Sequence, residues 1–124
     1  MIRILIADDH AVVAEGLKQL IEAQADMQVV AIAGDGREAV REAGEFEPDL
    51  VLIDIGMPKL SGYDVARHIR ERYGKDRPVL VALTGWKQAS DRILATLAGF
   101  HHHVAKPYDP GALLALIRRF DKPV

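Results

Sequence analysis

Runs of apolar residues alternate along the chain with segments in which apolar residues recur every three or four positions. The apolar runs, which predict strands, span residues 2–7, 29–33, 51–54, 78–83 and 102–105. Helical segments span residues 11–23, 37–45 and 89–98. Another helical segment follows the loop 57–62 and runs to about residue 72, and a last one begins at residues 109–110. Five strand–helix repeats in this order predict right-handed crossovers and one parallel sheet with helices on both faces.

The third apolar run shows no alternation of polar and apolar residues, and it ends in Asp54. Such a run is typical of a strand that is covered on both faces. Asp54 then projects from the carboxyl end of the sheet, and ligands of open α/β sheets bind in the crevice beyond those ends. Taken alone, the segment is equally compatible with a carboxylate that merely ends a strand.

Polar side chains also follow the other strands. Asp8 and Asp9 come after the first strand, Thr84 after the fourth and Lys106 after the fifth. If the strands are parallel, these residues meet Asp54 at one edge, where three carboxylates raise one another's pKa unless a cation lies between them. A divalent ion with oxygen ligands meets that need, and Mg²⁺ is the usual choice where phosphate is handled. Each residue alone is explained by a turn or a strand end, whereas the combination indicates phosphoryl transfer onto a carboxylate.

Composition and charge narrow the class of protein. The 124 residues are 49% hydrophobic and 27% charged, with a formal net charge of -2 and no cysteine. These values predict one globular domain over residues 1–124 that needs no disulfide, and they give no electrostatic footprint for nucleic acid or a membrane surface. Because no apolar stretch approaches the roughly 20 residues that cross a bilayer, we expect a soluble cytoplasmic protein.

The sequence resembles the receiver domains of two-component response regulators over essentially its whole length. The motifs that carry the resemblance are residues 4–10 (ILIADDH), 54–58 (DIGMP), 83–85 (LTG) and 106–107 (KP). The resemblance implies a single receiver domain with the flavodoxin-like fold: a doubly wound, five-stranded parallel sheet of order 2-1-3-4-5 with five helices, in three layers. It also implies a phosphorelay switch in which a histidine kinase or hybrid kinase donates a phosphoryl group from its phosphohistidine. Such a protein catalyses only its own phosphorylation and dephosphorylation and is not a turnover enzyme.

The resemblance assigns a role to each residue of the acidic edge. Asp54 is the phosphoacceptor and forms an aspartyl phosphate. Mg²⁺ is ligated directly by Asp9, by Asp54 and by the backbone carbonyl of Gly56, while Asp8 acts through a water molecule.

Further residues are implied to contact the phosphoryl group or to report its presence. Lys106 pairs with the phosphoryl group or, before phosphorylation, with Asp54, and Thr84 moves to bind a phosphoryl oxygen. The Lys106–Pro107 peptide bond is expected to be cis, an isomer that is accessible because the second residue is proline. His103 stands where many receivers carry an aromatic switch residue. Two roles remain open for it: a switch residue, or a half-buried ring that only fills space.

Two positions bear on how long the phosphoryl group persists. Gly56 and Trp86 lie two residues past Asp54 and Thr84 and flank the approach of a hydrolytic water. Gly56 has no side chain to orient that water and Trp86 can cover the site, so we expect slow self-dephosphorylation.

The output surface is implied only by the family. In receivers the fourth helix, fifth strand and fifth helix form the usual surface for a homodimer or an output partner. Residues 1–45 resemble receivers that precede a DNA-binding helix-turn-helix, whereas residues 82–86 and 99–116 resemble receivers attached to hybrid kinases. Both a stand-alone regulator and a receiver from a longer protein agree with the sequence.

Three other functions fit the fold less well. A phosphorylation-independent interaction scaffold would not need the complete set of site residues. A small Mg²⁺-dependent aspartyl phosphatase typically needs a second carboxylate two residues after the nucleophile, where this chain has Gly56. A flavodoxin-like mononucleotide binder needs a phosphate loop rich in glycine and hydroxyls, where this chain has residues 8–10 (DDH).

Overall fold

The computed structural model describes residues 1–57, 60–74, 77–84 and 99–120. Its strands and helices are β1 (Ile2–Ala7), α1 (Ala11–Glu22), β2 (Met27–Ala33), α2 (Gly36–Phe46), β3 (Leu50–Asp54), α3 (Gly62–Tyr73), β4 (Val79–Thr84), β5 (His102–Ala105) and α5 (Pro110–Arg118). The helix predicted over residues 89–98 lies outside the described residues.

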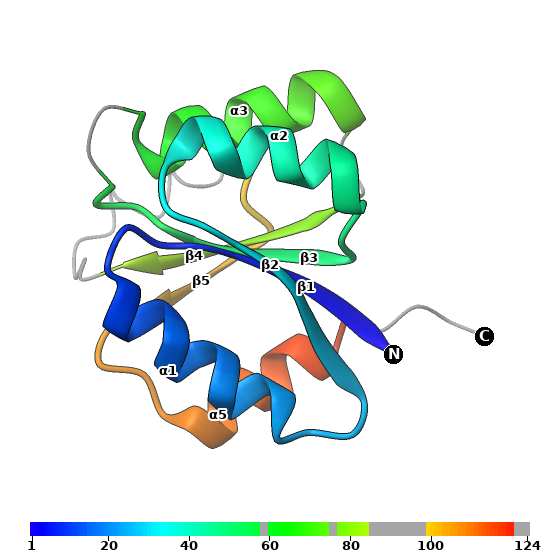
Figure 1. Cartoon of the computed structure of the whole chain (residues 1–124), viewed down its shortest axis with the longest axis vertical. Helices are drawn as coiled ribbons and strands as arrows, with labels where there is room; N and C mark the ends of the chain where they lie inside the picture. The colour runs from blue at the N-terminus through cyan, green and yellow to red at the C-terminus, as the bar shows by residue number, and fades with distance from the viewer. Residues whose placement is uncertain (58–59, 75–76, 85–98, 121–124) are drawn as a thin grey trace.

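The five strands form one sheet of order β2-β1-β3-β4-β5, and every neighbouring pair is parallel. Helices α2 and α3 cover one face of this sheet, and α1 and α5 cover the other (Figure 1). The predicted flavodoxin-like, three-layer architecture is therefore confirmed. All strand arrows point toward the same side of the molecule, so the carboxyl ends share one edge.

The core consists of two apolar layers, one on each face of the sheet. Alternate side chains of a strand point to opposite faces, so in β3 Val51 and Ile53 join the layer under α2 and α3, while Leu50 and Leu52 join the layer under α1 and α5. All five residues of β3 are buried. This double coverage explains why the sequence of the third strand is an unbroken apolar run.

Most described helices begin at a residue whose side chain caps the helix. The carboxylates of Asp35 and Asp109 accept the backbone N–H of the third residue after them, at 2.8 Å in each case, and Ser61 does the same at the start of α3. These bonds satisfy backbone donors that a helix leaves without partners. Helix α1 differs, because its N-cap residue His10 makes no capping bond with its side chain.

Helix α3 begins so close to the end of β3 that only glycine fits at its first position. A Cβ atom at Gly62 would lie 2.8 Å from the Cα atom of Ile55. This close approach holds the loop that follows Asp54 against the body of the domain.

Helix α5 packs an apolar stripe into the core layer that it shares with α1. This stripe consists of Leu113, Leu114 and Ile117, all of which are buried, whereas Ala115 is exposed. None of the helices in the described part of the chain is both long enough and apolar enough to cross a bilayer.

Candidate functional site

Acidic side chains from two strands meet at the carboxyl edge of the sheet. Asp8 and Asp9 follow β1, Asp54 ends β3, and His10 begins α1. Each of these four residues offers a ligand atom, and the four atoms lie within 4.8 Å of one another. The structure thus brings together the three carboxylates that the sequence predicts, and it adds an imidazole.

Asp8 is the most deeply buried member of the group. Its side chain is 0% exposed, and its Oδ1 accepts the backbone N–H of His10 at 2.9 Å. Its Oδ2 has no hydrogen-bond partner among the described residues. Burial raises the pKa of Asp8 above its ordinary value of 3.8; the backbone N–H of His10 lowers it and the nearby Asp54 raises it further.

The buried Asp8 oxygen provides a test of whether the cluster fits a cation. A buried polar atom without a partner is costly, and a carboxylate oxygen is a preferred ligand of hard divalent ions. The residues present therefore fit a metal ion, because they offer oxygen ligands and include a buried oxygen that no described residue satisfies. Asp9 completes the acidic face with a side chain that is 23% exposed.

Asp54 is held by both a backbone and a side-chain donor. Its Oδ1 accepts the N–H of Gly56 at 3.1 Å and the Nζ of Lys106 at 3.4 Å. The Asp54 side chain is 8% exposed and that of Lys106 is 34% exposed. The predicted pairing of Lys106 with Asp54 is thus present in the structure.

Thr84 and Lys106 lie at the adjoining ends of β4 and β5. Thr84 lies opposite Ala105 in the parallel register, and the backbone N–H of Lys106 donates to the carbonyl of Thr84 at 2.7 Å. Thr84 is buried at 3% exposure. The Lys106–Pro107 bond is cis, as the resemblance implies.

The remaining predicted residues lie as follows. His103 lies within β5 opposite Ala82 and is half-buried. Gly56 is exposed, and a Cβ atom there would lie 3.7 Å from Asp54 Oδ1, in ordinary contact. Trp86 lies outside the described residues.

His10 is the residue of this edge that the sequence prediction missed. Its ring Nδ1 lies 3.4 Å from Asp8 Oδ1, 3.2 Å from Asp9 Oδ1 and 3.9 Å from Asp54 Oδ2. One signal was available, because histidine stands at the N-cap position of a predicted helix, where Ser, Thr, Asp or Asn is preferred. Because the His10 side chain does not cap the helix, it can make another contact, here with the carboxylates.

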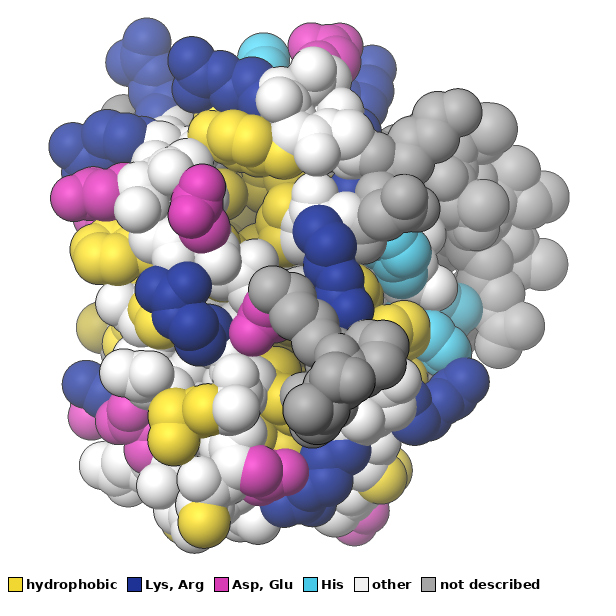
Figure 2. Space-filling model, turned by 90° about the vertical axis from the view of Figure 1, so that its right-hand side faces the viewer, with side chains coloured by type: hydrophobic (Ala, Val, Ile, Leu, Met, Phe, Trp, Pro, Cys, Tyr) yellow, Lys and Arg dark blue, Asp and Glu magenta, His cyan; other side chains and the backbone are white. Residues whose placement is uncertain are grey.

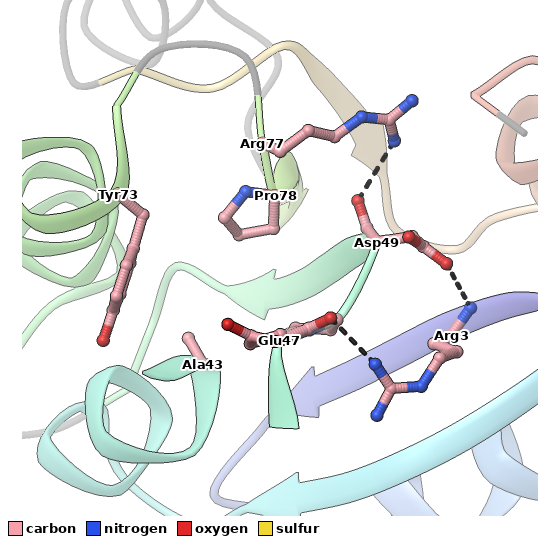
Figure 3. A pocket seen from close by; sticks show the side chains of 8 residues that line it. Arg3, Ala43, Glu47, Asp49, Tyr73, Arg77 and Pro78 are labelled. Carbon is pink, nitrogen blue, oxygen red and sulfur yellow. Dashed lines mark hydrogen bonds between the residues drawn. The ribbon is translucent and has the colours of Figure 1, made fainter. Parts of the chain in front are cut away.

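A separate pocket of about 470 Å³ lies at the opposite, amino edge of the sheet. Figure 3 shows three hydrogen bonds among the residues that line it, each between a side chain and a backbone group. Arg3 donates to the Glu47 carbonyl at 2.9 Å, Asp49 accepts the Arg3 N–H at 2.9 Å, and Arg77 reaches the Asp49 carbonyl at 3.4 Å. On this face Lys and Arg side chains lie among Asp and Glu (Figure 2). These contacts join the starts of β1, β3 and β4, so we interpret them as structural.

Comparison with known proteins identifies the family of the fold and site. The family model described as response regulator receiver domain matches residues 4–118. The chain is 43% identical over 84 residues to the transcriptional regulatory protein YdfI of Bacillus subtilis (strain 168), covering 68% of this chain and 38% of that protein. It is 34% identical over 116 residues to the nitrate/nitrite response regulator protein NarP of Escherichia coli (strain K12), covering 94% of this chain and 53% of that protein.

A solved structure agrees with these relatives. The response regulator domain of Thermotoga maritima CheB superposes with a TM-score of 0.86 at 31% identity, covering 99% of both chains. The chain spans about half the length, or less, of the two curated relatives named above.

Proposed function

Because the chain belongs to the response regulator receiver domain family, we propose that it is a phosphorylation-controlled switch whose phosphoacceptor is Asp54. The observation that carries the proposal is the setting of this carboxylate. It stands at the end of a fully buried strand, beside the buried Asp8 and within 3.4 Å of the Lys106 ammonium group. A carboxylate nucleophile with a neighbouring cationic donor is what phosphoryl transfer onto a carboxylate requires.

The donor in this proposal is the phosphohistidine of a partner histidine kinase or hybrid kinase. An oxygen of the Asp54 carboxylate forms a bond to phosphorus while the phosphorus–nitrogen bond of the donor breaks. The electron pair of that bond returns to the donor imidazole, and the product is an aspartyl phosphate. Lys106 Nζ, which already faces Asp54 Oδ1, balances the charge that collects on the phosphoryl oxygens. The Thr84 hydroxyl, on the adjoining strand end, donates to one of them.

The cofactor in this proposal is Mg²⁺. Its ligands are Asp9, Asp54 and the Gly56 carbonyl, with Asp8 acting through water, and the unpartnered Asp8 oxygen supports the assignment. When bound, Mg²⁺ supplies positive charge that offsets the repulsion among the carboxylates and the incoming phosphoryl group.

The output of the switch is proposed to be a change of surface rather than turnover of a substrate. Thr84 and the region of His103 reposition, and the surface of β5 and α5, together with the fourth helix that the resemblance implies, changes its affinity for an output partner or a second copy of the chain. We place this switch in the cytoplasm, with no direct contact of this domain to nucleic acid or membrane.

The proposal is tested by incubating the purified chain with a small-molecule phosphodonor and Mg²⁺ and measuring its intact mass. A phosphoryl group adds about 80 Da, and we expect this increment in the wild type, only with Mg²⁺, and not in Asp54→Asn. An increment that survives Asp54→Asn would move the phosphoacceptor elsewhere. No increment from either a small-molecule donor or a phosphorylated kinase domain would favour a phosphorylation-independent scaffold.

A further inference from the structure

We propose that His10 Nδ1 is a fourth ligand of the acidic site and makes it a site for a first-row transition-metal dication, with Zn²⁺ or Co²⁺ bound more tightly than Mg²⁺. This inference rests on the proposed function because it uses the same carboxylates. It goes beyond it by naming a further ligand and by assigning a metal preference to this chain.

The distances suit a shared ion. Metal–ligand bonds of about 2.1 Å place neighbouring ligands about 3.0 Å apart around an octahedral ion and about 3.4 Å apart around a tetrahedral one. His10 Nδ1 lies 3.2, 3.4 and 3.9 Å from oxygens of Asp9, Asp8 and Asp54. The four ligand atoms lie within 4.8 Å of one another. Small side-chain adjustments therefore bring His10 Nδ1 onto an ion that Asp9 and Asp54 ligate directly and that Asp8 contacts through water.

Packing in the core does not explain where the His10 ring lies. Its side chain is 67% exposed and makes no capping bond at the start of α1. The backbone is fixed instead by the bond from the His10 N–H to Asp8 Oδ1 at 2.9 Å. This bond ties the histidine to the carboxylate that is buried beneath it.

A second observation, at the buried member of this cluster, also points to a ligand. The Asp8 side chain is completely buried, yet its Oδ2 has no hydrogen-bond partner in the described part of the chain. A water molecule on a bound cation would supply the missing partner.

The imidazole changes which cation suits the site. Carboxylate and carbonyl oxygens suit Mg²⁺, whereas imidazole nitrogen suits Zn²⁺, Co²⁺ and their neighbours, whose affinity for a mixed nitrogen and oxygen site rises along the first transition row. With His10 as a ligand, such an ion competes with Mg²⁺ for the phosphoacceptor edge. The occupancy of the site would then respond to transition-metal supply.

The test measures the Zn²⁺ and Mg²⁺ affinities of the full chain by titration calorimetry. Zn²⁺ titrations are repeated in excess Mg²⁺, and the Zn²⁺ binding that Mg²⁺ weakens is assigned to the acidic site. His10→Ala is the test variant, and His68→Ala, an exposed histidine on α3, is the matched control. We expect His10→Ala to weaken Zn²⁺ at the competed site at least about tenfold, since even the outer partners of metal ligands cost on the order of 10–100-fold when lost. Mg²⁺ affinity should change little, and His68→Ala should match the wild type.

Nitrogen NMR of labelled histidine adds a direct readout. Zn²⁺ should shift the His10 ring nitrogen signal, which is assigned by its loss in His10→Ala, and Mg²⁺ should not. An unchanged or higher Zn²⁺ affinity in His10→Ala would overturn the inference, because the ring would then act only as a counter-ion that the metal displaces. If Zn²⁺ affinity is unchanged in His10→Ala while Asp54 is still phosphorylated, only the role of His10 as a ligand is refuted and the proposed function stands. If the wild type binds neither Zn²⁺ nor Mg²⁺, the assignment of Mg²⁺ as the cofactor is refuted as well.

Discussion

Asp8 should destabilise the protein when no cation is bound, and Asp8→Asn is the change that reveals it. Asparagine keeps an oxygen that can accept the His10 N–H, but it removes the charge from a side chain that is 0% exposed. It also replaces the unpartnered Oδ2 by an amide group, which can donate to neighbouring carboxylates. Because an unsatisfied buried polar group costs about 1–3 kcal/mol, we expect the variant to be more stable by about 1–2 kcal/mol.

The expected change in melting temperature follows from the size of the chain. An unfolding entropy of about 2.1 cal/mol/K per residue over 124 residues gives about 0.26 kcal/mol/K. A stabilisation of about 1–2 kcal/mol therefore corresponds to a rise in Tm of about 4–8 °C.

The effect has a defined pH dependence because the pKa of Asp8 is raised by burial from 3.8 in the folded protein. Between 3.8 and the raised pKa the folded state binds more protons than the unfolded state, so wild-type stability falls as pH rises through this window. The variant has no such proton to lose. The two proteins should be of similar stability below about pH 3.8 and should diverge above it.

The assay is thermal and urea unfolding, followed by circular dichroism, in buffer with a chelator at several pH values. Glu15→Gln, which removes an exposed carboxylate from α1, is the control and should change the free energy of unfolding by less than about 0.5 kcal/mol. Mg²⁺ should then raise the Tm of the wild type more than that of Asp8→Asn, since the variant loses an acidic neighbour of the ion. A variant that is equally stable or less stable than the wild type at neutral pH without metal would refute the reasoning.

Three further outcomes are expected from other parts of the structure. Gly62→Ala should lower the free energy of unfolding by about 1–3 kcal/mol, because its Cβ would lie 2.8 Å from the backbone of Ile55. Gly16→Ala, with open space around its Cβ, should raise the free energy of unfolding by about 0.5–1 kcal/mol. Urea unfolding of both variants tests this pair. Gly56→Asn should shorten the lifetime of the phosphorylated protein, because a Cβ at this position makes only ordinary contact with Asp54 Oδ1, at 3.7 Å, and the added amide can orient water there. Gly56→Ala, which adds no polar group, should leave the lifetime unchanged, and intact mass against time measures both. Burial, and to a smaller extent Arg119, lowers the pKa of His102 below 6.5 in the folded protein. The free energy of unfolding should therefore fall as pH falls below about 6.5, since the unfolded state then binds more protons. His102→Phe should remove this pH dependence in urea unfolding measured between about pH 5 and 8.

The strand order could be predicted from the sequence because it depends on features that a pattern records directly. An unbroken apolar run such as β3 requires cover on both faces, and alternation with helices requires parallel crossovers. The start of β2 was harder to predict, since this strand begins at Met27 rather than at residue 29 and its Gln28 is exposed. The register of β2 against β1 also slips between Ile4 and Leu5, leaving Val30 without a partner in the pairing. An edge strand with a bulge does not repeat a clean pattern, so its limits cannot be read from one.

The candidate site was predictable for the same reason, up to the orientation of one ring. Parallel strands bring their carboxyl ends together whatever the details of packing, so Asp8, Asp54 and Lys106 had to lie near one another. The direction of the His10 side chain depends instead on a single backbone bond to Asp8 and on the absence of a capping bond at α1. The burial of Leu114 is similar, because this residue lies beside Leu113 and Ile117 in α5 and the periodic pattern alone does not settle how wide a buried stripe is.

The way the chain begins its helices bears on what the acidic edge is for. At α2, α3 and α5 the residue before the helix uses its side chain to cap backbone N–H groups. At α1 that side chain is turned toward the carboxylates, and the buried Asp8 oxygen beneath it has no partner in the described residues. Both features cost stability in the free protein, and a bound cation would recover both, because it gives the oxygen a partner and the ring a ligand role. A sequence under selection for stability alone would place a capping residue at position 10 and a neutral one at position 8. The acidic pair followed by histidine is therefore better explained by ion binding at this edge than by the needs of the fold.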